Sequence, residues 1–101
     1  MSMVPLLSIC IPTYRRGHYL ARDIQRALLM TSRNDFEFVV VDNASPDGSF
    51  DALTAIHDSR LRCFKNTTNL GSFENFMRAL EESHGTYALI LMDKDSILIE
   101  H

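Results

Sequence analysis

The segment FEFVVVDNASPDGS, residues 36–49, indicates the fold class of this chain. It begins with a short, nearly continuous apolar run that ends at Asp42. Strands that are buried on both faces have this pattern, and they occur in parallel sheets covered by helices. Asn, Ser, Pro and Gly follow the run, and these residues are typical of the turn between a strand and a helix. The segment therefore predicts a buried parallel strand over 36–42, followed by a helix.

Similar apolar runs lie on both sides of this segment, and helical patterns separate them. We expect the other strands over residues 6–11, 61–66 and 86–92. We expect the helices over residues 18–30, 45–58 and 72–85. This alternation predicts an α/β three-layer sandwich, in which helices cover both faces of a central, mainly parallel sheet of four strands.

Local signals predict where these elements begin and end. Pro12 is expected to stop the first strand. Ser45 is a suitable N-cap for the second helix, with Pro46 at its first helical position. The third helix is expected to carry an apolar stripe that includes Phe73 and Phe76, with Gly85 as its stop signal.

The composition fits one soluble globular domain over residues 1–101, with 46% hydrophobic and 23% charged residues. A net charge of −3 argues against a nucleic-acid partner or an anionic membrane surface, which favour a basic excess. No apolar run approaches the roughly 20 residues that span a bilayer, so we expect no transmembrane segment in this chain. Cys10 and Cys63 are interpreted as free thiols in a reducing compartment, which predicts a cytoplasmic protein.

Polar residues follow the first and second strands, at the sheet edge where open parallel sheets bind ligands. Tyr14 offers an aromatic face for a planar base and Arg16 a guanidinium for phosphate, although Tyr14 is equally able to pack over the sheet end. Asp42 and Asn43 offer hydrogen bonds to a ligand base, although both residue types are also ordinary turn formers.

Two carboxylates, Asp93 and Asp95, follow the fourth strand as a D-x-D pair. Like charges so close together are unfavourable unless a cation lies between them, and Mg²⁺ or Mn²⁺ prefers carboxylate oxygen. Neutralisation by Lys94 is the alternative interpretation. The sequence contains neither the G-x-G-x-x-G motif of dinucleotide-binding folds nor a P-loop, which argues against those two nucleotide-binding classes.

Four segments taken together resemble a known family. They are LSICIPTYRR, FEFVVVDNASPDGS, NLGSFENFMRAL and HGTYALILMDKDS. In this order they resemble the N-terminal, nucleotide-sugar-binding portion of the family 2 glycosyltransferases, over residues 6–98. The resemblance implies the GT-A, nucleotide-diphospho-sugar transferase-like fold, truncated here, with strand order 3-2-1-4. Asn69, Gly71 and Asn75 also resemble a bacterial branch that builds O-antigen and other surface polysaccharides and includes abequosyltransferase-like members.

The resemblance also implies roles for individual residues. The nucleotide-binding residues it implies are Pro12, Thr13, Tyr14, Arg16, Asp42, Asn43, Asn69 and Asp93. Among these, Asn43 falls where the family reads the edge of the base, and Asp42 is expected to support that loop. Asp95, together with Asp93, is the implied ligand of a divalent Mn²⁺ or Mg²⁺ ion.

The implied reaction is inverting, metal-assisted transfer of a sugar from a nucleotide-diphosphate donor to a hydroxyl of a saccharide or lipid-linked saccharide acceptor. The catalytic base is expected beyond residue 101, so we expect the chain to be the donor-binding half of a longer catalytic domain, inactive by itself. Membrane association of the full-length protein stays open. The fourth strand is then an uncovered apolar edge, which predicts a homo-oligomer through residues 86–99.

Two other functions remain as alternatives. A nucleotidyltransferase-like enzyme has a similar α/β form but favours a Gly-rich, basic first loop, which PTYRRGHYL does not provide. A non-catalytic nucleotide-binding α/β module, such as a receiver-like domain, favours an Asp at the end of the third strand, where this chain has KNTTN.

Overall fold

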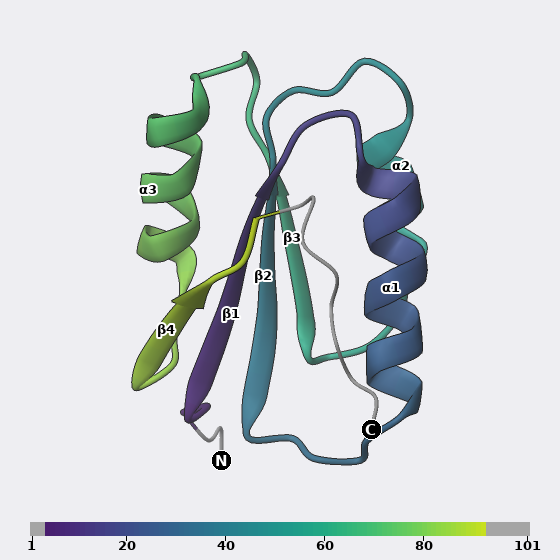
Figure 1. Ribbon diagram of the computed structural model, residues 1–101, viewed down its shortest axis with the longest axis vertical. Coiled ribbons are helices and arrows are strands. Elements are labelled where there is room, and N and C mark those ends of the chain that lie inside the picture. The colour runs from purple at the N-terminus through teal and green to yellow at the C-terminus, as the bar shows by residue number, and fades with distance from the viewer. Residues whose placement is uncertain (1–3, 93–101) are drawn as a thin grey trace.

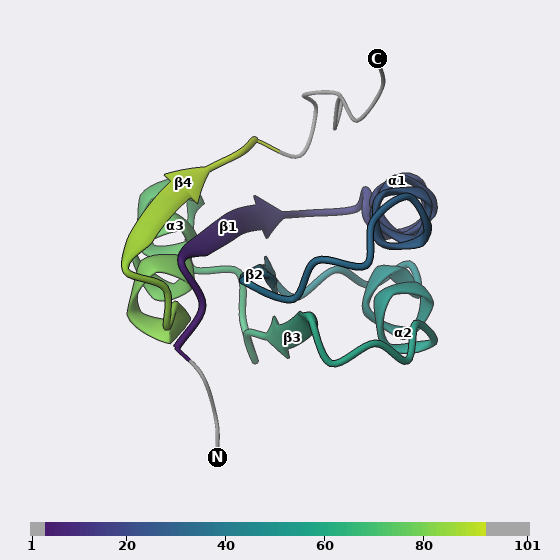
Figure 2. The same ribbon diagram turned by 90° about the horizontal axis from the view of Figure 1, so that it is seen from below.

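Four parallel strands form one sheet, in the order β3-β2-β1-β4 (Figure 1). The computed structural model describes residues 4–92. In this part of the chain the strands are β1 (Leu7–Thr13), β2 (Phe36–Asp42), β3 (Leu61–Lys65) and β4 (Tyr87–Ile90). The helices that connect them are α1 (Gly17–Leu29), α2 (Ser49–Thr54) and α3 (Ser72–Glu82). Figure 2 shows α1 and α2 on one face of the sheet and α3 on the other. The predicted three-layer fold and its 3-2-1-4 strand order are confirmed.

The core has two parts, one on each face of the sheet. Phe38 and Val40 of β2 pack with α1 and α2, whereas Val39 and Val41 of the same strand pack with α3. Successive side chains of a strand point to opposite faces, so a strand covered by helices on both faces must be apolar throughout. The nearly continuous apolar run of β2, interrupted by Glu37, therefore agrees with the central place of this strand in the sheet.

The free cysteines belong to these two different parts of the core. Cys10 is fully buried on the α3 face, whereas Cys63 packs on the α1 face. The sheet therefore separates the two thiols, which agrees with the prediction that they do not form a disulfide. Burial raises the pKa of the Cys63 thiol to about 11.

The first strand continues through Pro12, contrary to the prediction that this residue stops it. The Thr13 carbonyl accepts a 2.9 Å hydrogen bond from the N–H of Asn43, the residue after β2. The Cys10 carbonyl accepts one from the N–H of Leu91, on the opposite side of β1. Backbone groups of successive residues in a strand face alternate neighbouring strands, so the backbone nitrogen of Pro12 faces β4. In the described residues, the β1–β4 ladder ends at Cys10 and Ile90. The missing N–H of proline therefore removes no ladder bond.

The second helix begins later than predicted, at Ser49 and not at Ser45. The Ser45 hydroxyl is unavailable as a cap because it donates a 2.7 Å hydrogen bond to the buried Asp42 carboxylate. Asp47 accepts hydrogen bonds from the N–H and the hydroxyl of Ser49, at 3.1 and 2.6 Å. Gly48 precedes the helix with φ of +82°, a conformation that favours glycine.

A buried carboxylate joins the strands at the opposite, amino edge of the sheet. Glu37 of β2 is 5% exposed and accepts hydrogen bonds from the Ser8 hydroxyl, the Arg62 guanidinium and the His84 N–H. The Ser8 hydroxyl in turn accepts a 2.7 Å bond from the Gly85 N–H. Residues of β1, β2 and β3, and of the segment that leads into β4, thus meet at one acidic side chain. This side chain lies far from the edge where ligands are expected.

None of the helices within residues 4–92 is long and apolar enough to cross a membrane.

Candidate functional site

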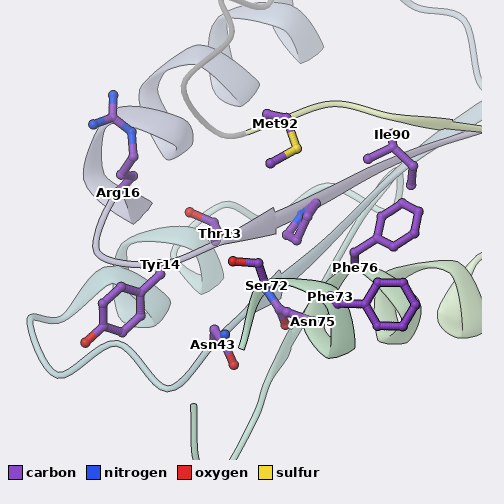
Figure 3. A pocket seen from close by; sticks show the side chains of 11 residues that line it. Thr13, Tyr14, Arg16, Asn43, Ser72, Phe73, Asn75, Phe76, Ile90 and Met92 are labelled. Atoms are coloured by element: carbon purple, nitrogen blue, oxygen red, sulfur yellow. The ribbon is translucent and has the colours of Figure 1, made fainter. Parts of the chain in front are cut away.

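A pocket of about 700 Å³ lies at the carboxyl edge of the sheet, between the loop after β1 and the first turns of α3 (Figure 3). Five of the predicted site residues line it, namely Pro12, Thr13, Tyr14, Arg16 and Asn43. The other lining residues are Ser72, Phe73, Asn75 and Phe76 of α3, Ile90 at the end of β4, and Met92 shortly after that strand. The sheet edge predicted from the sequence therefore holds a pocket in the structure.

Residues of α3 form a wall of this pocket that the sequence interpretation did not include. The sequence predicts Phe73 and Phe76 only as part of an apolar helical stripe, whereas in the structure Phe73 is 68% exposed and both line the pocket. Their rings lie 6.2 Å apart, so they form one apolar surface. A helical apolar stripe alone does not distinguish a core face from a pocket face, and the available signal was only that α3 begins at the ligand-binding edge of the sheet.

The loop after β1 is held by the loop after β2. The Arg15 N–H donates a 2.7 Å hydrogen bond to Ser45 Oγ, which itself donates to Asp42 Oδ1 at 2.7 Å. The Ser45 N–H donates to Asp42 Oδ2 at 2.8 Å. Asp42 is 0% exposed, so its carboxylate supports these loops from below and does not reach the pocket.

Both loops contain a residue with a left-handed backbone that is not glycine. These residues are Arg15, with φ of +60°, and Ala44, with φ of +65°. Such conformations are unfavourable for L residues and persist where surrounding bonds hold them. The bond between Arg15 and Ser45 is one such restraint, and it lies directly between Tyr14 and Arg16.

Tyr14 and Arg16 diverge from this strained loop and lie at the open side of the pocket (Figure 3). Tyr14 is 39% exposed, and the Arg15 guanidinium carbon lies 5.4 Å from its ring centroid. One face of the Tyr14 ring is therefore covered by a cation, a favourable contact that also orients the ring. The Arg16 guanidinium is similarly placed 5.5 Å from the centroid of the Tyr19 ring.

Asn43, which lines the pocket, is in direct contact with Asn69. Asn43 is 5% exposed, and its Nδ2 donates a 2.9 Å hydrogen bond to Asn69 Oδ1. Asn69 does not line the pocket, and its Oδ1 also accepts a bond from the Gly71 N–H. The structure therefore brings these two predicted residues together as partners of each other.

The predicted metal ligands Asp93 and Asp95 lie outside the described residues. Within residues 4–92, no group of three or more His, Cys, Asp or Glu side chains is arranged to hold a metal ion. Met92, the last described residue, lines the pocket, and the D-x-D pair follows it in the sequence.

Comparisons with known proteins match the chain to a family and to relatives. The family model described as Glycosyl transferase family 2 matches residues 8–101. Abequosyltransferase RfbV of Salmonella typhimurium is 31% identical over 96 residues, which are 91% of this chain and 29% of that protein. The UDP-Glc:alpha-D-GlcNAc-diphosphoundecaprenol beta-1,3-glucosyltransferase WfaP of Escherichia coli is 31% identical over 90 residues, which are 89% of this chain and 36% of that protein. The chain thus spans about a third of the length of these relatives.

Solved glycosyltransferase structures have the same fold. The mannosyltransferase PcManGT from Pyrobaculum calidifontis, in complex with GDP-Man and Mn²⁺, superposes with a TM-score of 0.75 at 25% identity, covering 94% of this chain and 29% of that one. TarS from S. aureus superposes with a TM-score of 0.76 at 24% identity, covering 89% of this chain and 28% of that one. These neighbours confirm the GT-A architecture. Because the family model matches residues 8–101, which are most of this chain, the chain belongs to glycosyl transferase family 2.

Proposed function

We propose that this chain is the donor-binding half of a glycosyltransferase catalytic domain, and that it binds a nucleotide-diphosphate sugar in the pocket at the carboxyl edge of the sheet. The observation that carries the proposal is the meeting of five predicted residues around one pocket of about 700 Å³. Such a volume suits a ligand of nucleotide-sugar size. The likeness to a mannosyltransferase that holds GDP-Man supports the ligand class.

Of the residues at the open side of the pocket, we assign Tyr14 to the base and Arg16 to the diphosphate. The exposed face of Tyr14 is suited to stacking on a planar base, because its other face is already covered by Arg15. Arg16 offers a guanidinium, which binds phosphate oxygens in pairs. Pro12 and Thr13 bring the end of β1 close to the ligand, and Asp42 holds the loop from beneath.

The charge balance of the pocket fits a divalent cation. Among its lining residues in the described part of the chain, Arg16 is the single cationic side chain, whereas a diphosphate carries at least two negative charges. We assign Mn²⁺ or Mg²⁺ to Asp95 and Asp93, because such ions prefer carboxylate and phosphate oxygen. A mannosyltransferase relative holds Mn²⁺, which supports this assignment. When bound, the ion would neutralise charge on the departing diphosphate.

The transfer itself is proposed to be inverting, with the acceptor hydroxyl deprotonated by a general base. The pocket lining within residues 4–92 contains no Asp, Glu or His, so we assign no proton transfer to these residues. The proposed acceptor is a saccharide or a lipid-linked saccharide of a bacterial surface polysaccharide. The printed activity of WfaP, on a diphosphoundecaprenol-linked sugar, supports this acceptor class.

The nucleotide proposal is tested by isothermal titration calorimetry of the chain with GDP-mannose, UDP-glucose and dTDP-glucose, each with and without Mn²⁺. We expect one of them to bind, and Tyr14→Ala and Arg16→Gln to weaken that binding roughly tenfold or more. Arg26→Gln is the control, since Arg26 lies in the last turn of α1, away from the pocket. Equal binding by Arg16→Gln and Arg26→Gln, or binding of none of the three sugars, would contradict the proposal.

A further inference from the structure

We infer that Asn43 is a positioning residue: its amide fastens the start of α3 to the end of β2, and this role requires an amide and excludes a carboxylate. This role replaces the predicted contact of Asn43 with the base edge. Its consequence for ligand binding rests on the function proposed above, but its structural part stands independently.

The hydrogen-bonding capacity of the Asn43 side chain is fully used within the protein. Its Oδ1 accepts from the Leu70 N–H at 2.8 Å and from Asn66 Nδ2 at 2.9 Å. Its Nδ2 donates to Asn69 Oδ1 at 2.9 Å and to the Gly71 carbonyl at 3.3 Å. An amide has two acceptor sites and two donor hydrogens, so none of the four is left for a base.

The backbone partners of this amide determine which side carries Oδ1 and which carries Nδ2. The Leu70 N–H can only donate, so it must face Oδ1, and the Gly71 carbonyl can only accept, so it must face Nδ2. Turning the amide by 180° would place Nδ2 against the Leu70 N–H, which is a second donor, and Oδ1 against the Gly71 carbonyl, which is a second acceptor. The same reasoning fixes Asn69, whose Oδ1 receives the Gly71 N–H at 2.9 Å.

The bonds continue from Asn43 into the sheet and into α3. Asn66, which follows β3, donates from Nδ2 to both Asn43 and Asn75, at 2.9 and 2.8 Å. Its Oδ1 accepts from the Arg78 guanidinium. Asn75 completes the chain by donating from Nδ2 to the Val41 carbonyl at 3.0 Å. We call Asn43, Asn66, Asn69 and Asn75 the amide network, and three of them are 5% exposed or less: Asn43, Asn66 and Asn75.

The amide network determines where one wall of the pocket stands. Gly71 immediately precedes α3 and has φ of +85°, and its carbonyl accepts from the Asn75 N–H as the first bond of the helix. Asn43 Nδ2 donates a hydrogen bond to that same carbonyl. The residues that follow, Ser72 and Phe73, line the pocket, so displacement of Gly71 displaces the wall.

A carboxylate at position 43 would reverse the polarity of two of these bonds. In Asn43→Asp, an oxygen replaces Nδ2 and opposes Asn69 Oδ1 and the Gly71 carbonyl, at the end of a side chain that is only 5% exposed. An unpaired charge at such a site is unfavourable and repels both acceptors. We expect residues 69–71 to separate from β2 while the rest of the sheet remains folded.

The test compares Asn43→Asp with Asn34→Asp, the same chemical change at an exposed position. Amide hydrogen exchange followed by NMR measures the bonds directly. We expect exchange of the Leu70 and Gly71 N–H groups to accelerate about tenfold or more in Asn43→Asp and to be unchanged in Asn34→Asp. Asn69→Ala, which alters an exposed side chain, is a milder second variant that is expected to accelerate Gly71 alone.

Calorimetry then separates positioning from base reading. If the wild-type chain binds nucleotide diphosphates, positioning predicts that Asn43→Asp weakens GDP, UDP and dTDP by the same factor. A change in the preferred base, with Leu70 and Gly71 exchange unchanged, would overturn the inference. If the wild-type chain binds no nucleotide, the proposed function fails, and the exchange measurement alone decides: unchanged exchange in both Asn43→Asp and Asn69→Ala overturns the inference.

Discussion

The backbone N–H of Arg15 donates a 2.7 Å hydrogen bond to the Ser45 hydroxyl, across a separation of 30 residues in the chain. This bond joins the two loops that leave the carboxyl ends of neighbouring strands. Arg15 has a left-handed backbone, and the Ser45 hydroxyl is itself held by the buried Asp42. The shape of the loop that carries Tyr14 and Arg16 therefore depends on a side chain in a different loop.

Removal of this bridge is expected to weaken both the fold and the site. In Ser45→Ala the Arg15 N–H and Asp42 Oδ1 each lose a partner, which is expected to lower the free energy of unfolding by about 1–3 kcal/mol. Chemical denaturation measures this change, and Ser59→Ala, at an exposed serine, is the control. Equal unfolding midpoints for the two variants would show that the bridge does not restrain the loop.

The guanidinium of Arg60 is expected to be irreplaceable by an ammonium group. It donates to the carbonyls of Leu28, Thr31 and Arg33 and closes the end of α1 against the start of β3, with a side chain only 15% exposed. Lysine does not have the planar fork that reaches several carbonyls at once. We expect Arg60→Lys to lower the free energy of unfolding by roughly 2 kcal/mol or more.

Arg33→Lys is the matched control for this prediction. Arg33 is 71% exposed and pairs with Asp35 at the surface, so its replacement is expected to cost less than about 1 kcal/mol. Thermal unfolding of the two variants under the same conditions provides the comparison. Similar melting temperatures would mean that the carbonyl bonds of Arg60 contribute little.

Stability is expected to fall in acid partly through Asp58. The Arg60 guanidinium donates hydrogen bonds to this carboxylate and lowers its pKa below the usual 3.8. A carboxyl whose pKa is lower in the folded state stabilises the fold above its unfolded pKa, and this contribution is lost as the pH falls through the folded pKa. Asp58→Asn should therefore flatten the dependence of the unfolding midpoint on pH below about 4. A variant with an unchanged acid slope would exclude this role for Asp58.

The sequence was sufficient to predict the sheet but not the contacts that shape its edge. The apolar runs determined the four strands, because β2 must be apolar to lie between two helical layers. Strand periodicity is a property of neighbouring residues. The bond between Arg15 and Ser45 depends on which loops the fold brings together, and no local pattern contains that information.

The same limit explains two local differences. Ser45 has the composition of an N-cap, yet its hydroxyl bonds to Asp42, so α2 begins at Ser49. Glu37 lies in a run interpreted as apolar, and its burial is possible only because Ser8, Arg62 and His84 bond to it from other elements. In each case a tertiary partner outweighs the local preference.

The uncovered side of β4 is expected to cause self-association. Within the described residues β4 pairs only with β1, and its side chains Tyr87 and Leu89 are 65% and 51% exposed. Because an apolar edge strand offers free backbone groups to another chain, we propose a homo-oligomer through residues 86–99, whose part from 93 on lies outside the described residues. We expect sedimentation velocity to show an average mass that rises with concentration. Leu89→Lys should reduce this association, whereas Leu29→Lys, at an 82% exposed leucine on α1, should not. A wild-type chain that stays monomeric at high concentration, or equal effects of the two substitutions, would contradict an assembly through β4.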